Sequence, residues 1–354
     1  MMEDRYSTRR GSSERENRFF SNRIRFMDLF MTLCVAAMHI SYNAGREDII
    51  TNIMKNASGG AMGWFFFMSS FWYFKDYDHG IAWKKFKKRL RTLLIPYIIW
   101  NTIEFMRING KAIVKAGSFF GFEKKWLIGL MFTRFNGLEY MPIDGPLWYI
   151  IRLLGYFLVS PLIYFCIKDK KAGILSIVTC FFLTRNGGYY HFDGWLCLFM
   201  VGAYVGLHYR KAYVTLFTHF NLDKGHRRLG LIGIIIVYTI LTIIWQTVLG
   251  AGIQMWAGIH YFIAYLMAAI PIVIFDAPKV KSEVAGYSFG IYCGHMVLVP
   301  LFNKILSRVD NFFPIAGGLW AMILLSAVCI FIVIMYKTLK TISPRLEALF
   351  TGGR

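Results

Sequence analysis

Ten apolar stretches, each near the length of a membrane-spanning helix, follow one another along the 354-residue chain. A helix rises about 1.5 Å per residue, so about 20 apolar residues cross the hydrocarbon of a bilayer. The stretches are residues 26–42, 59–75, 92–107, 146–167, 172–186, 194–208, 229–249, 257–275, 284–302 and 316–336. Their apolar residues are continuous rather than alternating, which argues against a porin-like barrel.

Composition agrees with this pattern, since 56% of the residues are hydrophobic, 17% are charged and the mean hydropathy is +0.46. These values are too apolar for a soluble globular protein. The chain is therefore predicted to be an all-α integral membrane protein, a bundle of about ten transmembrane helices.

The 40 Lys and Arg residues outnumber the 20 Asp and Glu residues, yet their distribution indicates topology rather than nucleic-acid binding. Most of them fall in alternate connections, the pattern of basic residues on the cytoplasmic side. Both termini are thus predicted to be cytoplasmic. The expected organisation is an Arg-rich tail over 1–22, without signal-peptide features, a membrane domain over 23–340 and a second cytoplasmic tail over 341–354.

The cysteines have no metal-site spacing. Each lies inside or at the edge of an apolar stretch, which is typical of small buried hydrophobic side chains. The six are Cys34, Cys166, Cys180, Cys197, Cys293 and Cys329. No metal is predicted.

The first apolar stretch, "RFMDLFMTLCVAAMHISYN", carries ionisable residues that are costly in lipid and therefore mark functional candidates. At 100° per residue, Asp28 and His39 fall within about 20° of one another on one helix face, roughly 16 Å apart along the axis. Arg25 can pair with Asp28 at i,i+3. The alternative is that Arg25 and Asp28 are interfacial and that His39 lies near the outer headgroups.

A second histidine, His295, lies near the middle of the stretch 284–302. Two histidines facing one cavity would form an acid–base pair, because imidazole titrates near neutral pH. A structural histidine that bonds a neighbouring helix is the alternative.

A dense basic cluster precedes the third stretch in "WKKFKKRLRTLLIPYIIWN". It comprises Lys84, Lys85, Lys87, Lys88, Arg89 and Arg91. Cytoplasmic anchoring accounts for most such clusters. A site for the phosphates of a cytosolic ligand is the functional interpretation. The long connection 107–145 is either a lid near an acceptor site or a spacer.

These stretches together resemble the membrane-bound acyltransferase-3 family, bacterial ten-helix proteins that modify surface sugars and lipids. The similar blocks occur in family order and span 23–302. They are "RIRFMDLF…H", "WFFFMSSFWYF", "FKKRLRTLLIPYIIW", "GPLWYIIRLLGYFLVSPLIY", "FMVGAYVG" and "YSFGIYCGH". The family usually has an acid, a base three residues later and a His eleven after the base. Here Met31 stands at the basic position, and the charges of Arg25 and Asp28 are exchanged.

The resemblance implies transfer of an acyl group, most often acetyl from cytosolic acetyl-CoA, to a hydroxyl of a surface polysaccharide or glycolipid. It places the protein in the bacterial cytoplasmic membrane. His39 is similar to the family's catalytic histidine, Arg89 to its basic-entry arginine and His295 to its late histidine. Asp28 is predicted to be a catalytic residue together with His39 and His295.

The remaining predicted site residues are expected to contact either the acyl-CoA donor or the acceptor substrate. Acyl-CoA phosphates are expected on Lys84, Lys85, Lys88, Arg89, Arg91 and Arg25. Substrate contacts are expected from Trp148, Tyr149 and Tyr292, the last also as an oxyanion donor.

Membrane lipid and a glycan or glycolipid acceptor are the expected partners, and nucleic acid is not. The alternative function is a transporter or flippase of a glycan or lipid intermediate that uses Asp28 and His39 as a proton relay. A membrane partner without catalytic activity is a further alternative.

Overall fold

The computed structural model describes residues 2–44, 50–51, 54, 61–131, 142–183, 194–219, 282–310 and 317–353. Within these ranges every regular element is a helix, which confirms the predicted all-α class. The chain folds as two compact units. Unit 1 draws on residues 1–31, 59–78 and 162–285, and unit 2 on residues 32–58, 79–161 and 286–354.

Three described helices are long and apolar enough to cross a membrane, over Phe20–Ser41, Gly286–Val309 and Gly317–Ile342. A fourth span arises if the bent pair Gly145–Leu158 and Ser160–Ile167 is counted as one. The chain is thus an integral membrane protein by length and composition of its helices. The predicted stretches 229–249 and 257–275 lie outside the described residues.

Helix α1 (Met2–Ala44) contains the first predicted stretch and also residues expected to form a tail. Its backbone is helical from Met2 onward. Extending an existing helix adds one hydrogen bond per residue fixed, whereas starting a new one is costly. The apolar part of α1 therefore gives the preceding residues a helix on which to extend.

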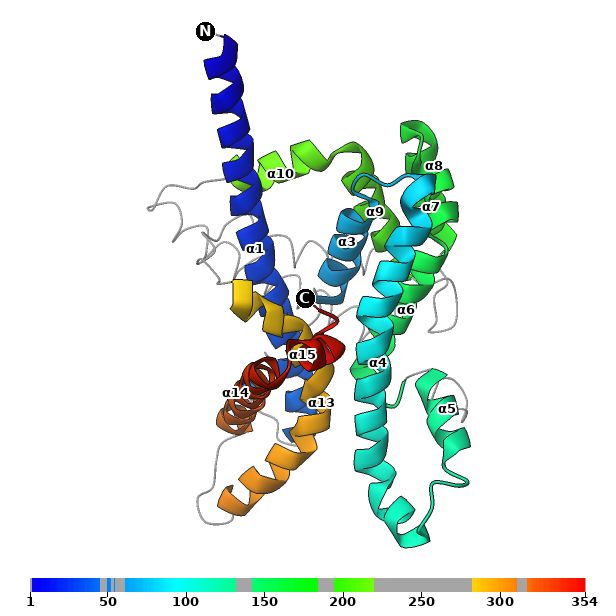
Figure 1. Cartoon of the computed structure of the whole chain (residues 1–354), viewed down its shortest axis with the longest axis vertical. Coiled ribbons are helices and arrows are strands. Elements are labelled where there is room, and N and C mark those ends of the chain that lie inside the picture. Colours follow the sequence, from blue (N-terminus) through cyan, green and yellow to red (C-terminus); the bar gives the residue numbers. More distant parts are fainter. Residues whose placement is uncertain are drawn as a thin grey trace, which may run out of the picture. The chain divides into compact units, whose positions relative to one another are not determined.

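In unit 1, helix α9 (Gly194–His208) packs against α3 (Ala61–Phe74), and the two lie side by side in Figure 1. A Cβ at Gly202 would lie 2.3 Å from the Phe67 carbonyl oxygen, and one at Gly206 would lie 2.4 Å from that of Phe71. Glycines four residues apart permit this close backbone approach, as in many membrane helix pairs.

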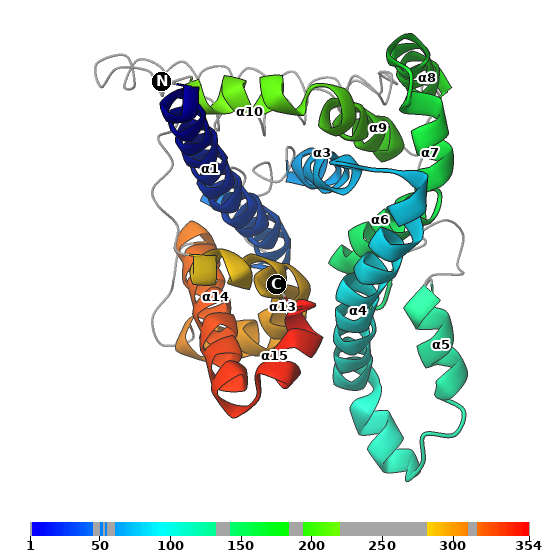
Figure 2. The same ribbon diagram turned by 45° about the horizontal axis from the view of Figure 1, so that its top comes forward.

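Two further helices of unit 1 flank α9. Helix α8 (Lys170–Leu183) meets it where Tyr204 donates a hydrogen bond to the Lys170 carbonyl at 3.0 Å. Helix α10 (Arg210–His219) follows directly after α9 (Figure 2). On α10, the Tyr213 ring contacts Phe71 of α3 in a tilted arrangement, with ring centroids 5.0 Å apart.

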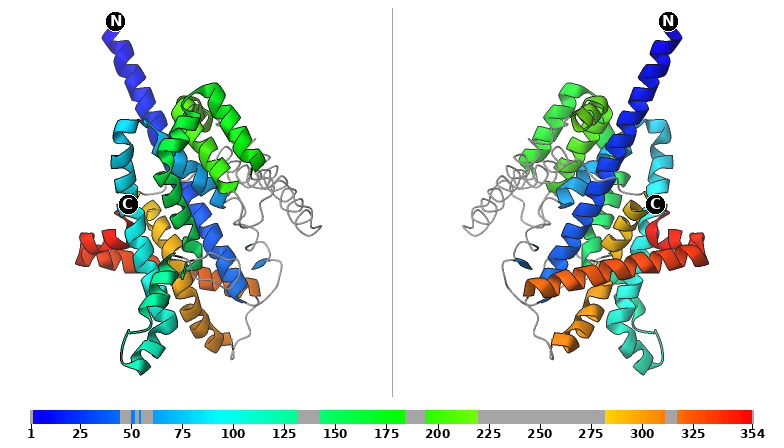
Figure 3. Two further views of the ribbon diagram at one scale, coloured as in Figure 1. Left: turned by 90° about the vertical axis from the view of Figure 1, so that its right-hand side faces the viewer. Right: turned by 90° about the vertical axis from the view of Figure 1, so that its left-hand side faces the viewer.

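Most of helix α13 (Ser282–Asp310) belongs to unit 2, where two glycines one turn apart on the same face contact two different helices. Gly290 faces the ring of Tyr336 on α14 (Gly317–Ile342), and Gly294 faces the indole of Trp100 on α4 (His79–Ala116). Figure 3 shows α14 as a long helix that leads into α15 (Pro344–Thr351). The absence of a Cβ at both positions lets large aromatic side chains pack on the α13 backbone.

Helix α15 occupies most of the predicted tail 341–354. The Ser343 hydroxyl caps it by accepting a hydrogen bond from the Leu346 amide, and Pro344 follows at the first helical position. Gly352 ends it at a φ of +72°, where a Cβ would lie 2.0 Å from the Thr92 carbonyl oxygen of α4. This part of the chain is therefore a capped helix that packs on α4.

The predicted stretch 146–167 is broken. The short 3-10 turn η2 (Gly145–Leu147) leads into α6 (Trp148–Leu158), and α7 (Ser160–Ile167) leaves at an angle of 62°. Pro161 has no amide hydrogen, so it cannot continue the hydrogen-bond ladder of α6. Helix α5 (Glu123–Met131) lies beside α4 and belongs to the long connection that follows it.

Candidate active site

The two predicted histidines face one another in unit 2. His39 of α1 and His295 of α13 have ring centroids 5.4 Å apart, with an angle of 34° between the ring planes. His295 is fully buried, whereas His39 is partly exposed. The fold therefore brings together imidazoles from opposite ends of the chain.

Hydrogen bonds to the backbone fix the tautomer of His295. Its Nδ1 lies 3.0 Å from the Ile291 carbonyl oxygen and 2.8 Å from that of Tyr292. Carbonyl oxygens only accept, so Nδ1 carries the proton of the neutral ring. Nε2 is then the nitrogen with a lone pair, and no described residue hydrogen-bonds to it. This oriented lone pair can accept a hydrogen bond from a protonated neighbour such as the His39 ring.

Tyr292 connects this pair to the start of α6. It lies one turn before His295, with ring centroids 6.4 Å apart, and its hydroxyl donates to the Pro146 carbonyl. The Tyr149 ring meets it edge-on at 5.9 Å. Two residues that were predicted to contact substrate, Tyr149 and Tyr292, are thus neighbours of the histidine pair.

Trp148 is partly exposed, and the Arg152 guanidinium lies 5.0 Å from its ring centroid. This cation–π contact accounts for Arg152, a charge inside a predicted span. Trp148 and Tyr149 project from consecutive positions of α6 and hence in different directions.

Asp144 is a buried acid immediately before η2. Its backbone amide donates to Asn101 Oδ1 of α4 at 2.9 Å, and Asn101 Nδ2 donates in turn to the Tyr97 carbonyl at 2.8 Å. About one helical turn beyond Asn101 on α4, Glu104 and Arg107 form a bidentate ion pair in which both N–O distances are 2.6 Å. Burial raises the pKa of the Asp144 carboxyl, the Glu104 charge raises it further and Arg107 partly opposes this.

The basic cluster occupies the first turns of α4. Lys84, Lys88 and Arg91 fall on one exposed stripe, while Lys85 and Arg89 fall on a second, partly buried stripe. The Arg89 guanidinium lies 5.8 Å from the Phe157 ring of α6. The cluster therefore presents one cation row to solvent and one row beside the start of the α6–α7 break.

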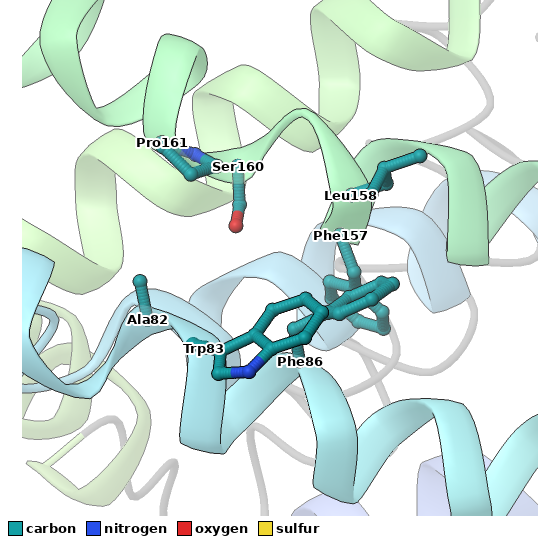
Figure 4. A pocket seen from close by; sticks show the side chains of 7 residues that line it. All are labelled: Ala82, Trp83, Phe86, Phe157, Leu158, Ser160 and Pro161. Carbon is teal, nitrogen blue, oxygen red and sulfur yellow. The ribbon is translucent and has the colours of Figure 1, made fainter.

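A groove of about 250 Å³ adjoins this cluster in unit 2. Aromatic rings of Trp83, Phe86 and Phe157 line one side, and Ser160 and Pro161 line another (Figure 4). An apolar groove flanked by cations is suited to an anionic ligand with an apolar or aromatic part.

The other predicted site residues lie in unit 1. Asp28 Oδ1 accepts a hydrogen bond from the indole Nε1 of Trp64 at 2.8 Å, and Arg25 is exposed. The sequence predicted Arg25, on the same helix, as the partner of Asp28, whereas the structure records a hydrogen bond from Trp64 on α3. Tertiary packing supplies this donor, because Trp64 is fully buried and its N–H needs an acceptor.

Comparison with known families identifies the family of the chain. The model of the acyltransferase-3 family, described as an acyltransferase domain, matches residues 22–337. The chain belongs to the acyltransferase-3 family. It is thus an O-acyltransferase, and the transporter interpretation is set aside.

The acyltransferase also resembles the succinoglycan biosynthesis protein ExoH of Rhizobium meliloti (strain 1021). The two are 23% identical over 296 residues, which cover 79% of this chain and 74% of ExoH. No solved structure matches the acyltransferase.

Two buried polar residues near the histidines of the acyltransferase were not singled out from the sequence, Asp144 and Asn101. Asn101 interrupts an apolar stretch that was predicted to span the membrane, and Asp144 lies two residues before another. Such interruptions are a usable signal. In the part of the acyltransferase that the structure describes, no three His, Cys, Asp or Glu side chains are grouped as metal ligands are.

Proposed function

We propose that the protein transfers an acyl group, most simply acetyl, from cytosolic acyl-CoA to a hydroxyl of a surface polysaccharide or glycolipid. The membrane is the bacterial cytoplasmic membrane, crossed about ten times, with both termini on the cytosolic side. The acyltransferase family supports the reaction class. Similarity to a protein of succinoglycan biosynthesis supports a polysaccharide acceptor.

The observation that carries the chemistry is the His39–His295 pair. His39 takes the proton from the acceptor hydroxyl, and the hydroxyl oxygen attacks the thioester carbonyl. The His295 Nε2 lone pair stabilises the imidazolium that forms on His39. Collapse of the tetrahedral intermediate breaks the carbon–sulfur bond, and the CoA thiolate takes the proton back from His39. The products are the acylated sugar and CoA thiol, so atoms and charges balance.

The donor site that we propose is the basic cluster at the start of α4. Lys84, Lys85, Lys88 and Arg91 supply positive charge for CoA phosphates. Arg89 presents a planar guanidinium that can contact a phosphate through two hydrogen bonds. The aromatic groove beside it is suited to the apolar parts of the same ligand.

The test uses purified protein in lipid nanodiscs with acetyl-CoA or succinyl-CoA labelled in the acyl group. The acceptor is the producing cell's own extracellular polysaccharide, stripped of ester groups by mild alkali. Label should pass from one thioester to the polysaccharide. His39→Ala should lower the rate by about 10²- to 10⁴-fold, the usual contribution of a general base.

Two further variants sharpen this test. His295→Gln, which keeps an acceptor atom near the Nε2 position, should retain more activity than His295→Ala. His208→Ala is the control, because His208 belongs to unit 1 and bonds the Ile167 carbonyl there. Full activity in a folded His39→Ala protein would refute the assignment of the base.

A further inference from the structure

Asp144 is 1% exposed, and neither of its carboxylate oxygens has a hydrogen-bond partner among the described residues. Buried polar side chains are nearly always hydrogen-bonded, because an unsatisfied group bears the full cost of losing water. A carboxyl group is the most costly case. Two carboxyl oxygens without a partner among the described residues are therefore available to a ligand.

The main chain at Asp144 is held from both sides. Asn101 of α4 accepts the Asp144 amide hydrogen at 2.9 Å, and Tyr292 of α13 donates to the carbonyl of Pro146 two residues later. Asn101 is itself fully buried and bonded to the Tyr97 carbonyl. The carboxyl is thus presented by a fixed backbone, which keeps its open oxygens in place.

The described residues that act on the Asp144 carboxyl include one acid and one base, Glu104 and Arg107. Arg107, the cation that acts on Asp144, gives two hydrogen bonds to Glu104, each 2.6 Å long. Glu104 acts on Asp144 as a like charge, and Tyr292 is within electrostatic range. Groups that donate neutral O–H bonds suit this position, whereas an additional anion would be repelled.

Position along α4 separates this carboxyl from the proposed donor phosphates. Asn101, which holds Asp144, lies twelve residues beyond Arg89 and therefore about 18 Å further along the helix axis. In the other direction, Tyr292 lies one helical turn from His295, the histidine with the open Nε2. We therefore assign Asp144 to the region of the histidines and not to that of the basic cluster.

We propose that Asp144 binds the acceptor sugar, its carboxyl oxygens taking hydrogen bonds from hydroxyl groups next to the one that is acylated. The inference rests on the proposed function and adds the substrate class, an uncharged sugar residue with neighbouring hydroxyls. Two hydroxyls on adjacent ring carbons can each donate to one oxygen, which fixes the orientation of the sugar as well as its affinity.

The experiment compares wild-type protein with Asp144→Asn and Asp144→Ala in the nanodisc assay, with de-esterified polysaccharide and acetyl-CoA or succinyl-CoA varied separately. Asp144→Ala should raise the acceptor KM about tenfold or more, while the thioester KM stays within about twofold. Asp144→Asn keeps the shape and one acceptor oxygen, so its acceptor KM should lie between the two.

Thermal midpoints show whether the variants are folded, and Asp144→Asn is expected to be at least as stable as wild type because it removes a buried acid. An unchanged acceptor KM in folded Asp144→Asn and Asp144→Ala would overturn the inference and leave the proposed function intact. So would a rise confined to the thioester KM. Wild-type protein that transfers no label from either thioester would instead refute the proposed function, and the acceptor role with it.

Discussion

Replacing Tyr292 with phenylalanine tests how strongly the bond to Pro146 holds the site together. Tyr292 is 4% exposed, and its hydroxyl donates a hydrogen bond to the main-chain carbonyl of Pro146, which is also buried. The variant leaves that carbonyl without this donor, and a buried polar group left unsatisfied costs about 1–3 kcal/mol. At roughly 2–4 °C per kcal/mol for a unit of this size, the midpoint of thermal unfolding should fall by about 2–12 °C.

Tyr336→Phe is the matched comparison. Tyr336 is also buried in unit 2, but the group beside its hydroxyl is the Trp100 side chain and not a main-chain carbonyl. Removing that hydroxyl leaves no main-chain carbonyl unsatisfied, so the midpoint should fall less than in Tyr292→Phe. Both variants lose one oxygen atom from a buried ring, and packing loss therefore cancels.

The measurement is intrinsic tryptophan fluorescence of detergent-solubilised protein during heating, with monodispersity checked by size-exclusion chromatography. The informative quantity is the difference between the two midpoints. Equal losses in the two variants would show that the effect comes from packing and not from the bond to Pro146. An unchanged midpoint in Tyr292→Phe would refute the role of this bond in holding η2.

Two further predictions concern stability. Gly202→Ala should destabilise by about 1–3 kcal/mol, because its Cβ would lie 2.3 Å from the Phe67 carbonyl oxygen of α3. Gly155→Ala, where the added methyl meets nothing within 4 Å, should be neutral or stabilising, and similar losses in both would contradict this packing account. Burial raises the pKa of Asp144 in the folded protein, so the unfolded chain releases that proton at a lower pH than the folded chain does. The free energy of unfolding should therefore fall as pH rises from the ordinary aspartate pKa toward the raised pKa of the folded protein. Midpoints measured across pH should show this fall relative to Asp144→Asn, and the opposite slope would refute the burial of an uncompensated acid.

The layout of unit 2 suggests how one helix serves both halves of the reaction. Helix α4 carries the basic cluster at its start and, about three turns beyond Arg89, the Asn101 side chain that positions Asp144. The proposed donor cluster and the proposed acceptor carboxyl are thereby kept apart. This separation is consistent with a reaction whose two substrates approach from opposite ends of a helix.

The sequence by itself determined the class of fold and part of the site. Run length and hydropathy are local properties, so the amino-acid order alone is enough to locate the apolar helices α1, α13 and α14. Ionisable residues in apolar stretches, such as His39 and His295, stand out for the same reason. The break at Val159 and the helix over Pro344–Thr351 were missed, although Pro161 and the Ser343–Pro344 pair carry the local signals.

Only the tertiary structure decided which of these residues meet. Helix periodicity gives the face on which His39 lies but not the helix that packs there, so the 5.4 Å contact with His295 could be proposed only as one possibility. The partner of Asp28 is an indole from α3. Asp144 becomes notable because packing buries it and no residue that the structure describes hydrogen-bonds to its carboxyl oxygens. Burial and partner choice depend on contacts between residues far apart in the chain, and a single sequence does not encode these locally.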